Sequence, residues 1–150
     1  MSTLYVMCGI PGSGKSTWLR KNAKPEDKII SRDEIRFSII QEGEEYFSRE
    51  DEVFEKFCSE IKTALNDGYD VYADATHINR GSRKKLLQQV MMYADSVIAI
   101  EMPTAVSLAL KRNEEREGLR YVPPSAIKRM YSQYEPPDLE EGFNDILIAI

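Results

Sequence analysis

The stretch Gly9-Ile10-Pro11-Gly12-Ser13-Gly14-Lys15-Ser16-Thr17 decides the fold. It matches G-x-x-x-x-G-K-[ST], the pattern of a phosphate-binding loop. The apolar run Leu4–Cys8 before it predicts a strand, and the residues from Thr17 onward can open a helix. Glycines allow backbone N–H groups to close around an anion, and the helix N-terminus adds the positive end of its dipole. An ordinary glycine-rich turn is the alternative, and the strand and helix in register with the loop argue against it.

The loop predicts ATP and Mg²⁺ as cofactors. Lys15 would reach the β- and γ-phosphates, and the hydroxyl of Ser16 would bind the metal. The loop residues expected to contact the nucleotide are Gly12, Ser13, Gly14, Lys15, Ser16 and Thr17.

Composition restricts the class of protein. A length of 150 residues favours one domain, residues 1–150, with its own core. The net charge of -5 argues against a protein that coats long nucleic acids, so any nucleic-acid contact should be short and local. We expect Cys8 and Cys58 to be reduced core residues, since neither has a metal-ligand spacing. With no run of about 20 apolar residues and no signal-peptide pattern, we expect a cytoplasmic protein without a membrane segment.

Strand-like and helix-like segments alternate along the chain, which predicts an α/β fold with a parallel sheet of five strands and helices on both faces. Ligands then lie beyond the carboxyl ends of the strands. The expected strands are 4–8, 28–31, 71–73, 97–102 and 145–150. The expected helices begin at Thr17 and cover 33–40, 48–66 with Ser48 as cap, Asn79 or Ser82 to 91, 104–116 and 125–134.

Asp33 follows the second predicted strand, and Arg36 lies one helical turn further on. A carboxylate there can face the transferring phosphoryl group and accept the proton of the acceptor hydroxyl. Arg36 can neutralise that carboxylate or bind a substrate phosphate in a bidentate manner. The alternative is that Asp33 caps the helix and Arg36 is a solvated charge. Proximity to the phosphate-binding loop favours the catalytic interpretation.

The third predicted strand ends at Asp74, a position at which a carboxylate on the Mg²⁺ side is common in phosphate-loop enzymes. A turn residue that closes the strand is an equal alternative. Thr76 is expected to contact the substrate. His77, the only histidine, is expected to hydrogen-bond within the loop or to hold substrate rather than to transfer protons.

Residues 112–124 predict a lid over the nucleotide. Arg112 and Arg116 are four residues apart on one helix face, and Arg120 follows Gly118. Their guanidinium groups would neutralise charge that develops on the phosphoryl group. The alternative is a solvated helix face whose arginines pair with neighbouring acids.

The order of the segments GIPGSGKSTW, SRDEIR, DATHIN, KRNEEREGLRYVP and IKRMYSQYEPP resembles the 5′-hydroxyl polynucleotide kinases of the phage type. The similarity extends over roughly residues 4–137. The phosphate-binding loop is shared by many families, whereas R-D-x-x-R after the second strand together with K-R-N and a lid ending in V-P is more specific.

The resemblance implies a P-loop kinase core with strand order 2-3-1-4-5 and transfer of the γ-phosphoryl group of ATP to the 5′-hydroxyl end of DNA or RNA. It implies that Lys15 and Ser16 bind ATP and Mg²⁺, that Asp33 is the general base and that Arg36 contacts the acceptor's phosphate. Arg112 would lie near the nucleotide, and Arg116 would be the catalytic lid arginine, with Arg120 as the alternative because the lid is one residue longer.

Two other classes of function stay open. One is a P-loop kinase that acts on a small-molecule hydroxyl, such as a nucleoside, a sugar acid or an antibiotic, which the acidic net charge favours. The other is a non-catalytic nucleotide-binding module. Arg36 and the basic group Arg80, Arg83, Lys84 and Lys85 favour an acceptor that carries phosphate, although that group also fits a solvated helix face.

Overall fold

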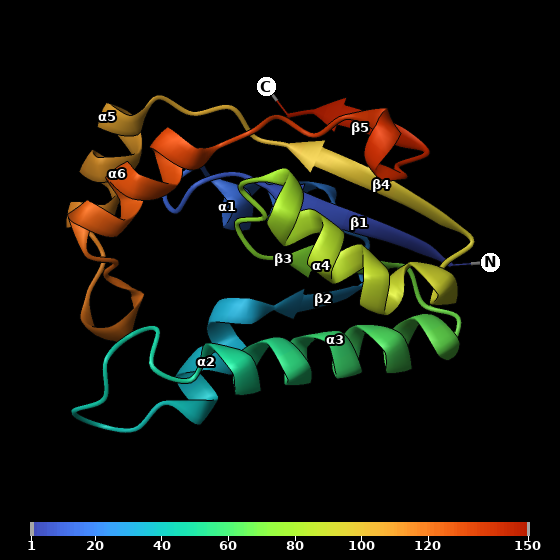
Figure 1. Ribbon diagram of the computed structural model, residues 1–150, viewed down its shortest axis with the longest axis horizontal. Coiled ribbons are helices and arrows are strands. Elements are labelled where there is room, and N and C mark those ends of the chain that lie inside the picture. The colour runs from blue at the N-terminus through green and yellow to red at the C-terminus, as the bar shows by residue number, and fades with distance from the viewer. Residues whose placement is uncertain (1, 150) are drawn as a thin grey trace.

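A parallel sheet of five strands forms the framework of the computed structural model, which describes residues 2–149 (Figure 1). The strands lie in the order β2-β3-β1-β4-β5, and each neighbouring pair is parallel. This confirms the predicted α/β class and the strand order 2-3-1-4-5 of a P-loop NTPase-type fold. The strands are β1 (Thr3–Cys8), β2 (Lys28–Ser31), β3 (Val71–Asp74), β4 (Ser96–Glu101) and β5 (Asp145–Ile148).

Helices cover both faces of the sheet, as the alternating pattern predicts. In β1, Leu4 and Val6 point into the core cluster that contains Phe57 of α3, whereas Met7 packs with Leu19 of α1 on the opposite face. In Figure 1, α3 and α4 lie in front of the sheet and α1 behind it. The helices are α1 (Lys15–Asn22), α2 (Arg32–Ile39), α3 (Glu50–Asn66), α4 (Arg80–Val90), α5 (Val106–Glu114) and α6 (Pro124–Gln133), with the short 3-10 turns η1 (Met91–Tyr93), η2 (Gly118–Arg120) and η3 (Leu139–Glu141).

The capping residues of two helices, α3 and α4, can be compared with the expectation. Ser48 does not cap α3, because its hydroxyl donates to the carbonyl of Glu45 at 2.7 Å and the helix begins two residues later. Of the two predicted starts for α4, Asn79 is the cap: its side-chain oxygen accepts from the backbone N–H of Ser82 at 2.8 Å. The last strand ends at Ile148, and the end of the predicted strand at residue 150 lies outside the described residues.

Both cysteines, Cys8 and Cys58, are free and buried in the core, as expected. Within residues 2–149, none of the helices combines the length and the apolar character needed to cross a lipid bilayer.

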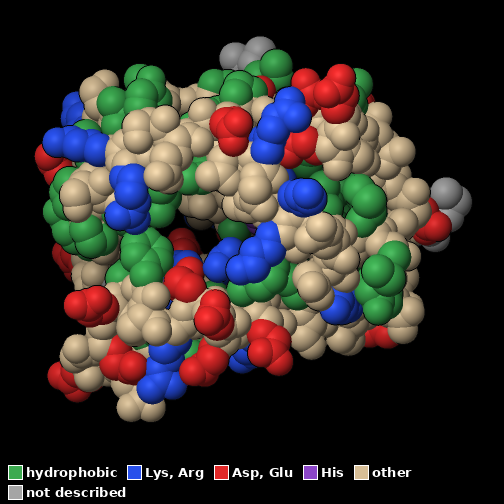
Figure 2. Space-filling view, in the orientation of Figure 1, with side chains coloured by type: hydrophobic (Ala, Val, Ile, Leu, Met, Phe, Trp, Pro, Cys, Tyr) green, Lys and Arg blue, Asp and Glu red, His purple; other side chains and the backbone are tan. Residues whose placement is uncertain are grey.

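The sequence predicted a basic surface group on α4 that included Arg83. This prediction is wrong for Arg83, because its side chain is fully buried. Its Nε donates to Glu141 at 2.8 Å, and its Nη1 donates to the carbonyls of His77 and Glu135, both at 2.9 Å. Arg83 therefore ties the segment before β5 to the loop after β3. Lys84 and Lys85 remain exposed on the helix, and Figure 2 shows Lys and Arg side chains at the surface over α4.

Candidate active site

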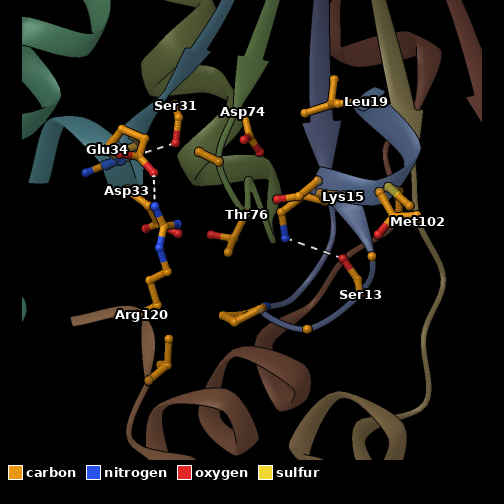
Figure 3. Close-up of a pocket in the computed structure, with 18 of the residues that line it drawn as sticks. Ser13, Lys15, Leu19, Ser31, Asp33, Glu34, Asp74, Thr76, Met102 and Arg120 are labelled. Atoms are coloured by element: carbon orange, nitrogen blue, oxygen red, sulfur yellow. Dashed lines mark hydrogen bonds and ion pairs between the residues drawn. The ribbon is translucent and has the colours of Figure 1, made fainter. Parts of the chain in front are cut away.

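A cavity of about 1210 Å³ opens beyond the carboxyl ends of β1, β2 and β3, where the strand order places a ligand site (Figure 3). The phosphate-binding loop forms one wall, and the start of α2 forms the facing wall. The cavity therefore brings together the predicted site residues Gly12, Ser13, Gly14, Lys15, Ser16, Thr17, Asp33, Arg36, Asp74, Thr76, Arg112 and Arg116.

Two glycines give the phosphate-binding loop its shape. Gly12 and Gly14 have φ angles of 85° and 94°, a region that side chains disfavour. A Cβ on Gly12 would also lie 2.6 Å from the carbonyl oxygen of Ala109, so α5 approaches the loop too closely for any other residue. Gly14 is the N-cap of α1, and the first turn of this helix carries no acidic residue, so its positive end is left for an anion.

Lys15 folds back over the loop. Its Nζ donates to the carbonyls of Gly9 at 2.8 Å and Ile10 at 3.0 Å, and it lies 3.4 Å from Ser13 Oγ. Burial lowers the pKa of Lys15 to about 8, against the opposing effect of Asp74. A partly buried ammonium held only by neutral carbonyls and a hydroxyl is suited to receive the negative charge of a phosphate.

Asp74 points from the end of β3 toward Lys15 (Figure 3). Burial raises its pKa, and the charge of Lys15 opposes that shift. Carboxylate and hydroxyl oxygens suit Mg²⁺, so Asp74 and Ser16 form a fitting donor pair. No group of three or more His, Cys, Asp or Glu residues that could hold a metal ion occurs in the described part of the chain. Mg²⁺ would therefore take its other ligands from nucleotide phosphates and water.

Asp33 lies in the first turn of α2, and it is not the cap of that helix. The cap is Ser31, whose Oγ accepts from the backbone N–H of Glu34 at 3.2 Å. The Asp33 side chain is 54% exposed and lines the cavity on the wall facing Lys15. The alternative that the carboxylate of Asp33 caps the helix is therefore excluded.

Arg36 is buried and engages two acids. Its Nε and Nη2 donate to the two carboxylate oxygens of Glu50, on α3, at 2.7 and 2.6 Å, and its Nη1 donates to Asp33. The hydroxyl of Tyr46 lies 3.4 Å from the same Nη1. These contacts raise the pKa of Arg36 above its ordinary value despite burial. Since the bidentate face of the guanidinium is taken by Glu50, any further anion can meet Arg36 only through a single N–H.

His77 is buried in the loop after β3, with a φ of 42°. Its Nδ1 donates to the carbonyl of Met7 at 2.7 Å, while its Nε2 has no partner in the described structure. Burial lowers the pKa of His77 to about 3, so the ring is neutral at physiological pH. The geometry favours the expected hydrogen-bonding role in the loop over proton transfer.

The three lid arginines have different partners. Arg112 donates through Nη1 to the carbonyl of Gly12 at 2.9 Å, on the phosphate-binding loop. Arg116 lines the cavity, and its charge is one of those that lower the pKa of Lys15. Arg120 instead reaches across the mouth to Glu34 at 2.5 Å, which Figure 3 shows. Arg120 therefore contacts the α2 wall, and Arg112 and Arg116 lie on the side of the phosphate-binding loop.

Sequence reasoning missed Glu50, Tyr46 and Asn113. Glu50 reads as one of several acids at the start of a helix, and Tyr46 falls in a stretch that looks like an exposed connection. Asn113 is buried and exchanges two hydrogen bonds with the backbone of Val122, at 2.7 and 3.0 Å, which closes the base of the lid. The triplet Lys111-Arg112-Asn113 is the sequence pattern that contains Asn113, but it was interpreted only through Arg112.

Solved structures with a similar fold fall into several functional groups. A chain of the Pnkp1/Rnl/Hen1 RNA repair complex matches 88% of this chain with a TM-score of 0.75 and 23% identity over 43% of its own length. A fungal RNA kinase matches 100% of this chain and 76% of its own, with a TM-score of 0.64 and 16% identity. A sugar kinase from Janibacter sp. HTCC2649 matches 99% and 85%, with a TM-score of 0.65 and 19% identity. The chain thus spans less than half the length of the repair-complex protein, and these likenesses show the fold.

The family is given by the sequence itself. The model of the AAA_33 family, described as an AAA domain, matches residues 4–137, which include the phosphate-binding loop, the α2 wall and the lid. The chain with this loop and this parallel sheet therefore belongs to the AAA domain family AAA_33.

Proposed function

We propose that this protein is an ATP- and Mg²⁺-dependent kinase that transfers the γ-phosphoryl group to the 5′-hydroxyl end of DNA or RNA. The observation that carries the proposal is the pairing of two walls in one cavity. Lys15 and the positive end of α1 lie on one side of the cavity, and Asp33 lies on the other. Asp33 does not cap α2, because Ser31 is the cap. A phosphoryl donor and a general base need this arrangement to face one another.

Each residue has a step in the proposed transfer. Lys15 and the loop N–H groups bind the β- and γ-phosphates, and Ser16 and Asp74 hold Mg²⁺, which when bound neutralises charge on the phosphates. Asp33 accepts the proton of the attacking hydroxyl as the new O–P bond forms and the bond from the γ-phosphorus to the β-γ bridging oxygen breaks. Arg116 stabilises the charge on the transferred group, and Arg112 supports the loop at Gly12.

The choice of nucleic acid as acceptor rests on three supports. The sequence resembles 5′-hydroxyl polynucleotide kinases, two similar folds belong to an RNA repair complex and an RNA kinase, and Arg36 stands beside Asp33. Thr76 lines the same cavity and is proposed to contact the acceptor. Because Glu50 holds the bidentate face of Arg36, we propose one N–H contact to an acceptor phosphate.

A panel of acceptors with radiolabelled ATP tests the proposal. A 5′-hydroxyl oligonucleotide and a nucleoside 3′-phosphate should be phosphorylated at least about tenfold better than a bare nucleoside, since one contact between a charged group and phosphate contributes roughly 1.5–3 kcal/mol. Arg36→Ala should reduce that preference. Equal use of bare nucleosides and oligonucleotides would contradict a polynucleotide acceptor.

The second candidate is a kinase for a small-molecule hydroxyl. The similar fold of a sugar kinase and the acidic net charge of -5 favour it. The same panel should therefore include gluconate and other sugar acids. Phosphorylation of one of these in preference to every nucleotide acceptor would select this candidate.

Asp33→Asn tests the general base in either case. Asparagine keeps the size of the side chain and cannot take the proton, so kcat should fall by roughly 10²–10⁴-fold with ATP affinity unchanged. Asp51→Asn, at an exposed first-turn aspartate of α3, is the matched control and should retain wild-type turnover. Normal turnover in Asp33→Asn would return this residue to a structural role.

A further inference from the structure

Tyr46 lies in the connection between α2 and α3. Its hydroxyl donates to Oδ1 of Asp33 at 3.3 Å and accepts from Nη1 of Arg36, 3.4 Å away. The guanidinium of Arg36 sits over the face of its ring, 4.8 Å from the centroid. Burial raises the pKa of Tyr46 to about 12, so the hydroxyl stays protonated and remains a donor at neutral pH.

The same side chain also packs against an apolar cluster that includes the lid residue Val122. The ring of Tyr46 packs against the second apolar cluster, which is separate from the main core. That cluster joins the lid end and α6 to the phosphate-binding loop, and its buried members are Ile10, Ile78, Ala109, Val122, Ala126 and Ile127. Tyr46 is therefore the side chain through which this cluster reaches the carboxylate of Asp33.

The need for such a contact follows from the exposure of Asp33. Its side chain is 54% exposed, so without fixed donors the carboxylate would rotate among several rotamers. Arg36 is anchored by Glu50 and supplies one fixed donor, and Tyr46 supplies the second to the same Oδ1. Among the described residues Oδ2 has no hydrogen-bond partner, which leaves it to accept a proton.

We infer that Tyr46 is a positioning residue, which orients the general base Asp33 and links that orientation to the apolar cluster that includes Val122. The inference rests on the proposed function of Asp33 as a base, and it holds for any hydroxyl acceptor. In the transfer step, the proton of the acceptor hydroxyl moves to Oδ2, the γ-phosphoryl group moves from ATP to the acceptor oxygen, and ADP leaves. Tyr46 fixes the direction of Oδ2 and exchanges no proton itself.

A double-mutant cycle with Tyr46→Phe and Asp33→Ala tests the inference on whichever acceptor the wild type phosphorylates best. Tyr46→Phe keeps the ring, its packing against the apolar cluster and its place under Arg36, and removes the hydroxyl. We expect kcat to fall about 5- to 20-fold with the KM of ATP unchanged, the loss of one hydrogen bond that holds a charged group. In the Asp33→Ala background the same change should leave the residual rate unchanged, because the group it positions is absent.

The matched control is Tyr93→Phe, which removes a hydroxyl from a tyrosine that is 40% exposed in η1. It should leave kcat unchanged. Tyr46→Phe that lowers the rate equally with and without Asp33 would overturn the inference and make Tyr46 a packing residue. An unchanged kcat in Tyr46→Phe would overturn it as well.

A measurement without substrate separates this inference from the proposed function. The shifts in melting temperature of Tyr46→Phe and Asp33→Ala should not add in the double variant, because the two groups share a hydrogen bond. Additive shifts would contradict the contact itself. A wild type that phosphorylates sugars but not oligonucleotides would refute the nucleic-acid acceptor and leave the cycle on Tyr46 fully measurable.

Discussion

The partly buried ammonium of Lys15 is held by the loop in a way that suits an anionic ligand. The Nζ is withdrawn from water and held by two backbone carbonyls, so its charged form is less favourable than in solution and its pKa falls to about 8. Binding of phosphate restores a negative partner. Nucleotide binding and protonation of Lys15 are therefore coupled.

This coupling predicts the pH dependence of ATP affinity. Below about pH 8 the free protein carries charged Lys15 and binds ATP fully, and above it the competent fraction falls about tenfold per pH unit. The Kd for ATP, measured by calorimetry from pH 7 to 9.5, should rise accordingly. Lys15→Arg stays charged over this range, so its Kd should be nearly constant. A parallel rise in both proteins would contradict the role of Lys15 titration.

At the scale of elements, α2 and the lid meet across the mouth of the cavity. Arg120 joins Glu34 and lies over the ring of Phe37, 5.3 Å from its centroid, whereas Arg116 lines the cavity and its charge lowers the pKa of Lys15. Both side chains of the Arg120–Glu34 pair are more than half exposed, so the pair contributes about 0–1 kcal/mol. The two arginines therefore differ in what their loss should change.

Arg116→Ala should lower kcat by roughly 10²–10³-fold, because it removes a positive charge from the transferring group. Arg120→Ala should change kcat by less than about threefold. Steady-state kinetics of the two variants, with ATP saturating, distinguish the roles. If Arg120→Ala is the inactive variant, the assignment of the lid arginines is reversed.

The elements that the sequence predicted well are those with a local signal. The loop around Lys15, the alternation of strands and helices, and the position of Asp33 after β2 all follow from short patterns, and the structure has the expected sheet order. Glu50 could not be predicted as a partner of Arg36, because the pairing joins two helices across a loop without regular structure. Ser31 and Ser48 show the same limit: each precedes a helix, yet Ser31 caps α2 whereas Ser48 hydrogen-bonds within the preceding loop and does not cap α3.

On the scale of the whole molecule, Arg83 connects the loop after β3 with the segment before β5. It lies on α4, holds the loop after β3 through His77 and holds the segment before β5 through Glu135 and Glu141. Since this loop also carries Thr76 into the cavity, the buried arginine links the stability of the fold to the shape of the site.

Arg83→Met should destabilise the protein by about 3–5 kcal/mol, because it leaves Glu141 and the carbonyls of His77, Glu135 and Pro136 without their donor. Arg83→Lys should rescue little, since an ammonium cannot reproduce the planar set of donors. Chemical denaturation followed by circular dichroism measures the loss, and Lys84→Met, at an exposed position on the same helix, should stay within about 0.5 kcal/mol of the wild type. Equal stability of Arg83→Met and Lys84→Met would mean that the fold does not depend on this buried arginine. A stable Arg83→Met protein with altered acceptor KM would instead assign Arg83 to the shape of the loop alone.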